Sequence, residues 1–263
     1  MSIVGEAVQS LIDAETEAFG RNIQFLTTTA QLTDDLTQVY DSLLLVFQEE
    51  AHSLDEYQVI SSSICLQSMR YQLIAGTLTQ FRGHISDSCS YTRKAIECAA
   101  FIVEILQDEQ SGKRWLEFGR SAGARRRYKS RFMAWEVVIR AKNILGPQLL
   151  DLYETLCLSV HPSYVSVIRQ IENSVDGSGP PIFHNIDVRS ERDLEILALS
   201  YFMLLDTHLM SIDAVRTALY TMDSEVDFSK FNTKLSAIAD AHTIERSRWR
   251  DLAERLRREL VDQ

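Results

Sequence analysis

The distribution of proline and glycine constrains this chain more than any other feature of its sequence. All four prolines lie between Pro147 and Pro181, so residues 1–146 and 182–263 contain none. Glycine accounts for only ten of the 263 residues. An all-β sandwich or barrel needs a turn signal roughly every 8–12 residues, and such signals are missing over most of the chain. The sequence therefore predicts an all-α protein built from long helices.

Apolar residues recur with the 3.6-residue period of a helix along most of the chain. This pattern predicts one all-α domain over residues 1–263, a helical bundle of seven to nine helices. N-terminal helices are expected within 2–50, a core over 54–222 and a C-terminal amphipathic helix over 228–260. The individual helices expected before the last one cover 2–31, 33–50, 53–81, 86–108, 109–122, 124–145, 147–160 and 190–222.

Local signals mark several of the expected helix ends. Ser53 and Glu56 have the spacing of a capping box, in which a hydroxyl and a carboxylate satisfy free N–H groups of the first turn. Either Ser86 or Ser88 is expected to cap the following helix. Gly146-Pro147 is a typical stop signal, and the proline also suits the first turn of a new helix.

One segment, Ser163 to Val188, breaks the helical pattern. It is rich in Val and Ile and contains the turn sequence Asp176-Gly-Ser-Gly-Pro-Pro181. The runs Tyr164–Ile171 and Ile182–Val188 could form a β-hairpin, or the first could be helical and the second a loop. In either case we expect an irregular or short hairpin insertion near 163–188, a place where a loop can form a site.

The bulk charge limits the kinds of partner. The formal net charge is −10 and the isoelectric point is near 5.1, which disfavours chain-wide attraction to nucleic acid or an anionic membrane. The sequence begins without a basic segment followed by an apolar run, so no signal peptide is expected. The most apolar stretch, Leu194 to Leu205, is shorter than the ~20 residues of a spanning helix. We therefore expect a soluble, cytoplasmic protein without a membrane partner.

Cysteine and histidine spacings give no metal or cofactor site. The four cysteines show no CxxC spacing, and the six histidines form no HExxH or HxxxH pair. The apolar surroundings of the cysteines indicate reduced, buried thiols. A Gly-rich phosphate loop and a nucleophile elbow are also missing from the sequence. Neither a metal nor another cofactor is therefore predicted.

A narrow polar stripe crosses an otherwise apolar helix. Between Ala95 and Leu106 only two residues are polar, and at 100° per residue Arg93, Glu97 and Glu104 fall on one side of the rod. An unpaired charge buried there would cost several kcal/mol, so these groups are expected to pair or to line a cleft. A buried structural ion pair and a functional polar cleft remain the two alternatives.

A second polar feature follows the helix that is expected to end at Val160. The proline after His161 disfavours helical backbone, so His161 should lie at a helix C-terminus, where the helix dipole favours its protonated form. It follows Glu154 by seven residues, on the same helix face. An imidazole at such an end can serve as a functional base or phosphate contact, or simply as a capping group.

Two segments, Tyr91 to Ala99 and Leu152 to Ser163, resemble a group of bacterial helical proteins related to the HEPN superfamily. The resemblance covers residues 60–222 and rests on an R-x-x-x-E motif in the first segment and an H-P-S motif in the second. It implies a helical bundle in which Arg93, Glu97 and His161 converge in a polar pocket. The candidate pocket residues are Arg93, Glu97, Glu154, His161 and Ser163.

The chain departs from HEPN ribonucleases, which the resemblance associates with a closely spaced Arg and His. The resemblance implies an Arg and a His separated by four to six residues, and no Arg stands at that distance before any of the six histidines here. Binding without efficient catalysis is therefore expected, and no catalytic residue is assigned. If the protein did act as a ribonuclease, His161 would be the general acid or base and Arg93 would stabilise developing phosphate charge.

Residues 113–142, the basic segment, have a charge opposite to that of the rest of the chain. This segment contains ten basic residues and only two acidic ones, Glu117 and Glu136, which gives a local net charge of +8. Five aromatic residues are interleaved with the charged ones. Arginine with aromatic neighbours suits phosphate contact and base stacking. The alternative is pairing with the protein's own acidic helices or with an acidic partner. The candidate phosphate contacts are Arg125, Arg126, Arg127, Lys129 and Arg131.

These observations lead to two hypotheses of function. The first is a HEPN-like protein that binds RNA, a nucleotide or another phosphate ligand. The second is a non-catalytic interaction protein, a homodimer or the binder of a protein partner, that acts through its terminal helices. The apolar residues of the expected helix 228–260, from Phe231 to Leu256, approximate a heptad pattern. This helix could therefore pack on the rest of the bundle or mediate dimerisation.

Overall fold

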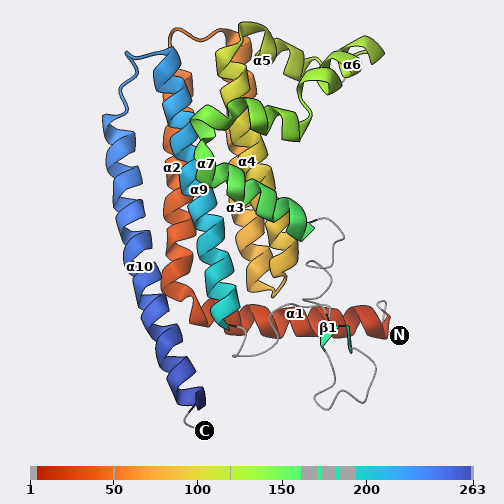
Figure 1. Cartoon of the computed structure of the whole chain (residues 1–263), viewed down its shortest axis with the longest axis vertical. Coiled ribbons are helices and arrows are strands. Elements are labelled where there is room, and N and C mark those ends of the chain that lie inside the picture. Colours follow the sequence, from red (N-terminus) through yellow and green to blue (C-terminus); the bar gives the residue numbers. More distant parts are fainter. Residues whose placement is uncertain are drawn as a thin grey trace.

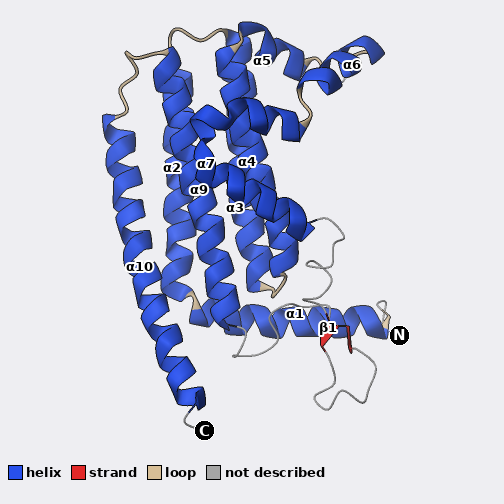
Figure 2. Cartoon of the chain, viewed as in Figure 1, coloured by secondary structure: helices blue, strands red, loops and turns tan. Residues whose placement is uncertain are grey.

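The all-α prediction is confirmed by the computed structural model (Figures 1 and 2). The structure describes residues 5–49, 51–118, 120–160, 171–172, 182–183 and 194–261. Over these residues it contains nine helices, which agrees with the expected seven to nine. The helices are α1 (Glu6–Phe25), α2 (Thr27–Glu49), α3 (Glu56–Phe81), α4 (Ile85–Gln107), α5 (Glu109–Leu116), α6 (Ala122–Arg131), α7 (Ala134–Val160), α9 (Leu194–Met222) and α10 (Ser229–Val261).

Four long helices, α2, α3, α4 and α9, run side by side along the long axis of the molecule (Figure 1). Helix α1 crosses their lower end almost at a right angle, and α10 covers one edge of the bundle. Helix α5 packs on the upper ends of α3 and α4, and α6 projects from there, away from the long helices. The central helix is α4, which packs against α3, α7 and α9. Its residues from Ala95 to Leu106 include eight apolar side chains that are fully buried.

Helix ends follow local chemistry, although two expected caps were wrong. The cap of α3 is Asp55, whose carboxylate accepts from the Gln58 N–H at 2.7 Å while the Gln58 side chain accepts from the Asp55 N–H. Ser53 therefore lies outside the helix. Helix α4 begins already at Ile85, so Ser88 is an interior residue that donates to a backbone carbonyl of α3 at 3.1 Å.

Two expected helix boundaries also differ from the structure. The first expected helix, 2–31, breaks at Leu26, a fully buried residue between α1 and α2. The expected helices 109–122 and 124–145 are instead α5, α6 and the first half of α7. Gly146 does interrupt the backbone as expected, with a φ of +80° that favours glycine, and α7 continues beyond this kink from Pro147.

Helix α9 is apolar on nearly every side. By length and composition it could cross a membrane, but 61% of its most apolar window is buried inside the bundle. Its buried side chains include Tyr201, Leu204, Leu205 and Val215, which belong to the main core cluster. An apolar helix that is buried over most of its surface in this way is an ordinary core helix of a large bundle.

Buried hydrogen bonds tie α9 to helices far away in sequence. The Tyr40 hydroxyl and His208 Nδ1 are 2.6 Å apart in the core between α2 and α9. Tyr201 hydrogen-bonds to the Thr33 hydroxyl and donates to the Thr29 carbonyl at 3.2 Å. Because a buried polar group left unpaired costs about 1–3 kcal/mol, these contacts fix how the helices align.

The expected insertion near 163–188 is described only in part. Ile171–Glu172 and Ile182–Phe183 form two short antiparallel strands, β1 and β2, with Ile171 opposite Phe183. The remainder of the insertion, together with His161 and Ser163, lies outside the described residues.

Helix α10 packs along α2, and Phe231, Leu235 and Ile238 contribute to the core. Farther along, the Trp249 indole N–H donates to the Thr29 hydroxyl at 3.0 Å. This is the packed arrangement that the sequence offered as the alternative to a dimerising helix.

Candidate functional site

The polar stripe of α4 is paired within the molecule. Arg93 Nε and Glu97 Oε1 are 3.3 Å apart, and both side chains are more than four-fifths buried. The Tyr153 hydroxyl, from the second half of α7, donates to the same Glu97 oxygen at 3.1 Å. The Tyr153 ring stacks on Trp135, with centroids 5.8 Å apart. Burial first, and then the charge of Glu97, raise the pKa of Tyr153 well above its usual value, so this phenol remains a donor.

Of the predicted pocket residues, the structure brings together Arg93 and Glu97. Glu154 is exposed on α7, and its neighbour Tyr153 makes the contact with Glu97 in its place. His161 and Ser163 follow the last residue of α7 and lie outside the described residues. Within the described part of the chain, Arg93, Glu97 and Tyr153 thus form a polar contact between α4 and α7.

Glu104, the other acidic residue of the stripe, holds two arginines of the basic segment. Its side chain is 6% exposed and lies 2.8 Å from Arg131 Nη2 and 3.0 Å from Arg140 Nε. The expectation that a charge at this position must be paired agrees with this geometry. Arg140 also donates to the Arg131 carbonyl, so the two arginines are held beside each other.

Asp108, at the end of α4, extends this cluster. Its carboxylate lies 2.9 Å from Arg131 and 3.2 Å from Arg114, and it accepts from the Gln110 N–H and the Ser111 hydroxyl at 3.0 Å each. Burial alone would raise the pKa of Asp108, but these hydrogen bonds and the two arginines together lower it. Three of the ten basic residues therefore serve intramolecular pairing.

The other cations of the basic segment behave differently. Arg125, Arg126 and Lys129 are exposed on α6, and among the described residues none of them forms an ion pair with an acidic side chain. Arg120, just before this helix, is exposed as well. The side chain of Arg127 lies outside the described part of the structure. Helix α6 thus presents a cationic surface at the tip of a projection (Figure 1).

Aromatic rings attach this projection to the bundle. Tyr128 of α6 lies between Phe118 and Phe132, with ring centroids 4.3 and 5.2 Å away, and Phe132 contacts Phe101 of α4. Phe132 is buried, whereas Phe118 is 41% exposed. Trp135, at the start of α7, is 47% exposed. Some of the interleaved aromatic residues are therefore core, and others remain accessible beside the cations.

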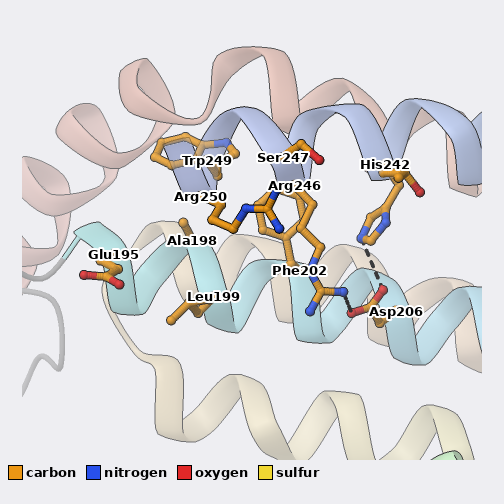
Figure 3. A pocket seen from close by; sticks show the side chains of 11 residues that line it. Glu195, Ala198, Leu199, Phe202, Asp206, His242, Arg246, Ser247, Trp249 and Arg250 are labelled. Atoms are coloured by element: carbon orange, nitrogen blue, oxygen red, sulfur yellow. Dashed lines mark hydrogen bonds and ion pairs between the residues drawn. The ribbon is translucent and has the colours of Figure 1, made fainter. Parts of the chain in front are cut away.

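A groove of about 730 Å³ lies between α9 and α10 (Figure 3). Its apolar surface comes from Leu199, Phe202 and Trp249, and its charged surface includes Arg246 and Arg250. This volume is in the range of small-molecule sites, which are typically about 300–1,000 Å³. The groove could not be predicted from the sequence, because it depends on how two helices approach each other.

The charges in the groove are organised around Asp206. Its two carboxylate oxygens lie 2.7 Å from Arg246 Nη1 and 3.4 Å from His242 Nε2, as Figure 3 shows. Burial lowers the pKa of His242. The charge of Asp206 raises this pKa and the charge of Arg246 lowers it, and the net effect is a lowered pKa. At neutral pH the histidine is therefore uncharged and the arginine neutralises Asp206. The contact closes one end of the groove and links α9 to α10.

One sequence signal could have indicated the groove. His242, Arg246, Trp249 and Arg250 are spaced to lie on a single side of a helix.

Comparisons of the chain with models of protein families, with curated proteins and with solved structures find no match.

Proposed function

We propose that this protein binds single-stranded RNA through the phosphate backbone, with α6 as the contact surface. The observation that carries the proposal is the division of the basic segment into paired and unpaired cations. Arg114, Arg131 and Arg140 contact Asp108 and Glu104. Arg120 and three cations of α6, namely Arg125, Arg126 and Lys129, are exposed instead.

Intramolecular ion pairs explain the arginines that contact Asp108 and Glu104, but they do not explain the exposed cations of α6. The exposed cationic side chains of α6 repel one another, because the helix contains no acidic residue from Ala122 to Arg131. Such a helix gains free energy when an anion approaches. A phosphate backbone supplies regularly spaced negative charges, each able to accept hydrogen bonds from a guanidinium group.

The exposed aromatic side chains favour a nucleic acid over an acidic protein. Phe118 and Trp135 are each nearly half exposed, close in sequence to the cations of α6. Unpaired bases stack on such rings with a gain of about 1–3 kcal/mol per base. Single strands offer bases for stacking, whereas bases in a duplex are already stacked on one another.

The rest of the molecule directs the ligand to this surface. The chain has a net charge of −10 although the basic segment contributes +8. Most of the surface therefore repels RNA, and binding should be local and strongly dependent on salt. The paired Arg93 and Glu97 do not enter this proposal, because each already has a partner.

The test is a salt series of fluorescence anisotropy with a labelled single-stranded oligouridine. Four phosphate contacts, from Arg120, Arg125, Arg126 and Lys129, predict a slope of about −3 for log affinity against log salt, since each contact to a single strand contributes about −0.7. The triple variant R125A/R126A/K129A should reduce the slope to about −1.

The matched control is K230A/K234A/R250A, which removes the same charge from exposed positions on α10. It should retain the slope of the wild-type protein. Equal losses in both triple variants would show that only net charge matters and would refute a site on α6. Binding of polyglutamate at the same salt dependence and affinity would favour an acidic protein partner and would also refute the proposal.

A further inference from the structure

Helix α3 has apolar side chains on two opposite faces. One face is buried in the bundle and includes Cys65, Leu66, Met69 and Leu73. The other face carries a row with alternating spacings of three and four residues, which is the contact pattern of paired helices. We call this row the α3 seam; it consists of Tyr57, Ile60, Ile64, Gln67, Tyr71, Ile74 and Leu78.

Most of the α3 seam is accessible, although at its N-terminal end the Lys113 ammonium group of α5 lies 5.7 Å from the centroid of the Tyr57 ring. Tyr57, Ile60, Ile64, Tyr71 and Leu78 are each 40–61% exposed. Side chains of this size bury about 150–250 Å² when fully covered, so the row leaves on the order of 500 Å² of apolar surface in water. The largest apolar patch on a typical monomer is about 300–600 Å² and often has a function, so this row is a candidate interaction surface. Other exposed apolar side chains, such as Ile244 on α10, belong to no comparable row.

The neighbours of the α3 seam allow another helix to approach closely. Small, partly exposed side chains flank the row, namely Ser63, Ser68 and Ala75. The seam spans 22 residues, which is about 33 Å of helix at 1.5 Å per residue. The flanking Arg70 already has a partner, because its Nε lies 3.2 Å from Asp41 Oδ1 of α2. This flank therefore brings no unneutralised cation to an approaching surface.

We propose that the α3 seam is the interface of a homodimer, in which α3 of one copy packs against α3 of a second copy. The position of the single polar residue in the row supports self-pairing. Gln67 lies at the midpoint between Tyr57 and Leu78, so a two-fold axis near it places amide against amide and apolar side chains against apolar side chains. Two facing carboxamides can each donate one hydrogen bond and accept one.

The available area also suits a second copy. A stable dimer buries about 800 Å² on each partner. The exposed seam supplies on the order of 500 Å² of this, and the flanking rows of α3 and parts of α2 and α4 lie beside it. The surface is separate from the cations of α6, so dimerisation through α3 does not depend on RNA binding.

The test is the mass of the full chain in solution, measured by light scattering and by sedimentation equilibrium from about 1 to 100 µM, the range in which typical homodimers associate. The wild-type protein should have twice its monomer mass of 30.0 kDa. I64E and Y71E place a charge within the interface and should yield monomers with unchanged helical circular dichroism. I244E, which changes an equally exposed apolar residue on α10, should remain dimeric.

A monomeric wild-type protein would overturn the proposal and leave the seam to a different occupant. A dimer that persists in both I64E and Y71E would overturn it as well. The axis is tested with Q67C, which should form a disulfide-linked dimer on mild oxidation, whereas Y220C on the exposed side of α9 should not. A dimer that Q67C fails to link would refute the two-fold axis at Gln67.

Discussion

His208 should make the stability of this protein sensitive to mild acid. It is fully buried on α9, and its Nδ1 lies 2.6 Å from the Tyr40 hydroxyl. Burial lowers the pKa of His208 from 6.5 to about 3. The folded protein therefore keeps this imidazole neutral at a pH where the unfolded chain protonates it. Because the unfolded state then binds one more proton, stability falls as the pH decreases from about 6.5 toward 3.

The size of the effect follows from the two pKa values. Between pH 7.5 and pH 5.0, a histidine with a pKa of 6.5 in the unfolded chain and about 3 in the folded protein removes about 2 kcal/mol from the free energy of unfolding. The substitution His208→Gln replaces the imidazole with a carboxamide, which can still hydrogen-bond to Tyr40 and cannot be protonated in this pH range. The variant should be less stable at pH 7.5, but its loss between the two pH values should be about 2 kcal/mol smaller.

The assay is urea unfolding followed by circular dichroism at both pH values, with the free energy extrapolated to water. His242 also has a lowered pKa, and it contributes equally to the wild-type protein and the variant, so the difference isolates His208. His52→Gln, at an exposed position, is the control for removing a histidine and should follow the wild-type protein. An identical pH dependence in His208→Gln and the wild-type protein would refute the argument.

Two further substitutions test the packing around the basic segment and α5. Glu104→Gln removes the buried charge that holds two arginines and should lower the free energy of unfolding by about 2 kcal/mol in urea titrations. The control is Glu136→Gln, because the exposed Glu136 carboxylate lies 4.0 Å from Arg140, and it should change this free energy by less than about 0.5 kcal/mol. Equal effects of the two substitutions would contradict the structural role of Glu104. Gly112→Ala places a Cβ 2.8 Å from the Tyr57 carbonyl and should lower the melting temperature through a loss of about 1–3 kcal/mol. In the control Gly20→Ala, the new Cβ meets nothing within 4 Å inside a helix, so the free energy of unfolding should increase by about 0.5–1 kcal/mol. A stabilising Gly112→Ala would show that α5 does not press on α3.

Helix content could be predicted from the sequence because it depends on residues close together in the chain. The 3.6-residue pattern identified nearly every helix, and the backbone break at Gly146 was indicated by its own sequence. Exact ends were less predictable, since Ser53 and Asp55 are both competent caps and only the packing of α3 selects the second.

Among the polar contacts, those between residues close together in the sequence could be predicted, and those between distant residues could not. The pairing of Arg93 with Glu97 follows from a spacing of four residues on one helix. The partners of Glu104 could not be identified in this way, because Arg140 lies 36 residues away and meets it only after α7 has packed on α4. The α3 seam is visible in the sequence as a pattern, but the pattern does not tell which of two apolar faces is buried.

The position of α9 in the bundle has a consequence for synthesis. Tyr40 and His208 are 168 residues apart, so α2, α3 and α4 leave the ribosome long before the helix that covers their inner faces. At about 5–20 residues per second, roughly 10–30 seconds separate the two events. During this interval the nascent chain exposes the surface that later becomes its core, which makes it a substrate for chaperones that bind emerging apolar helices.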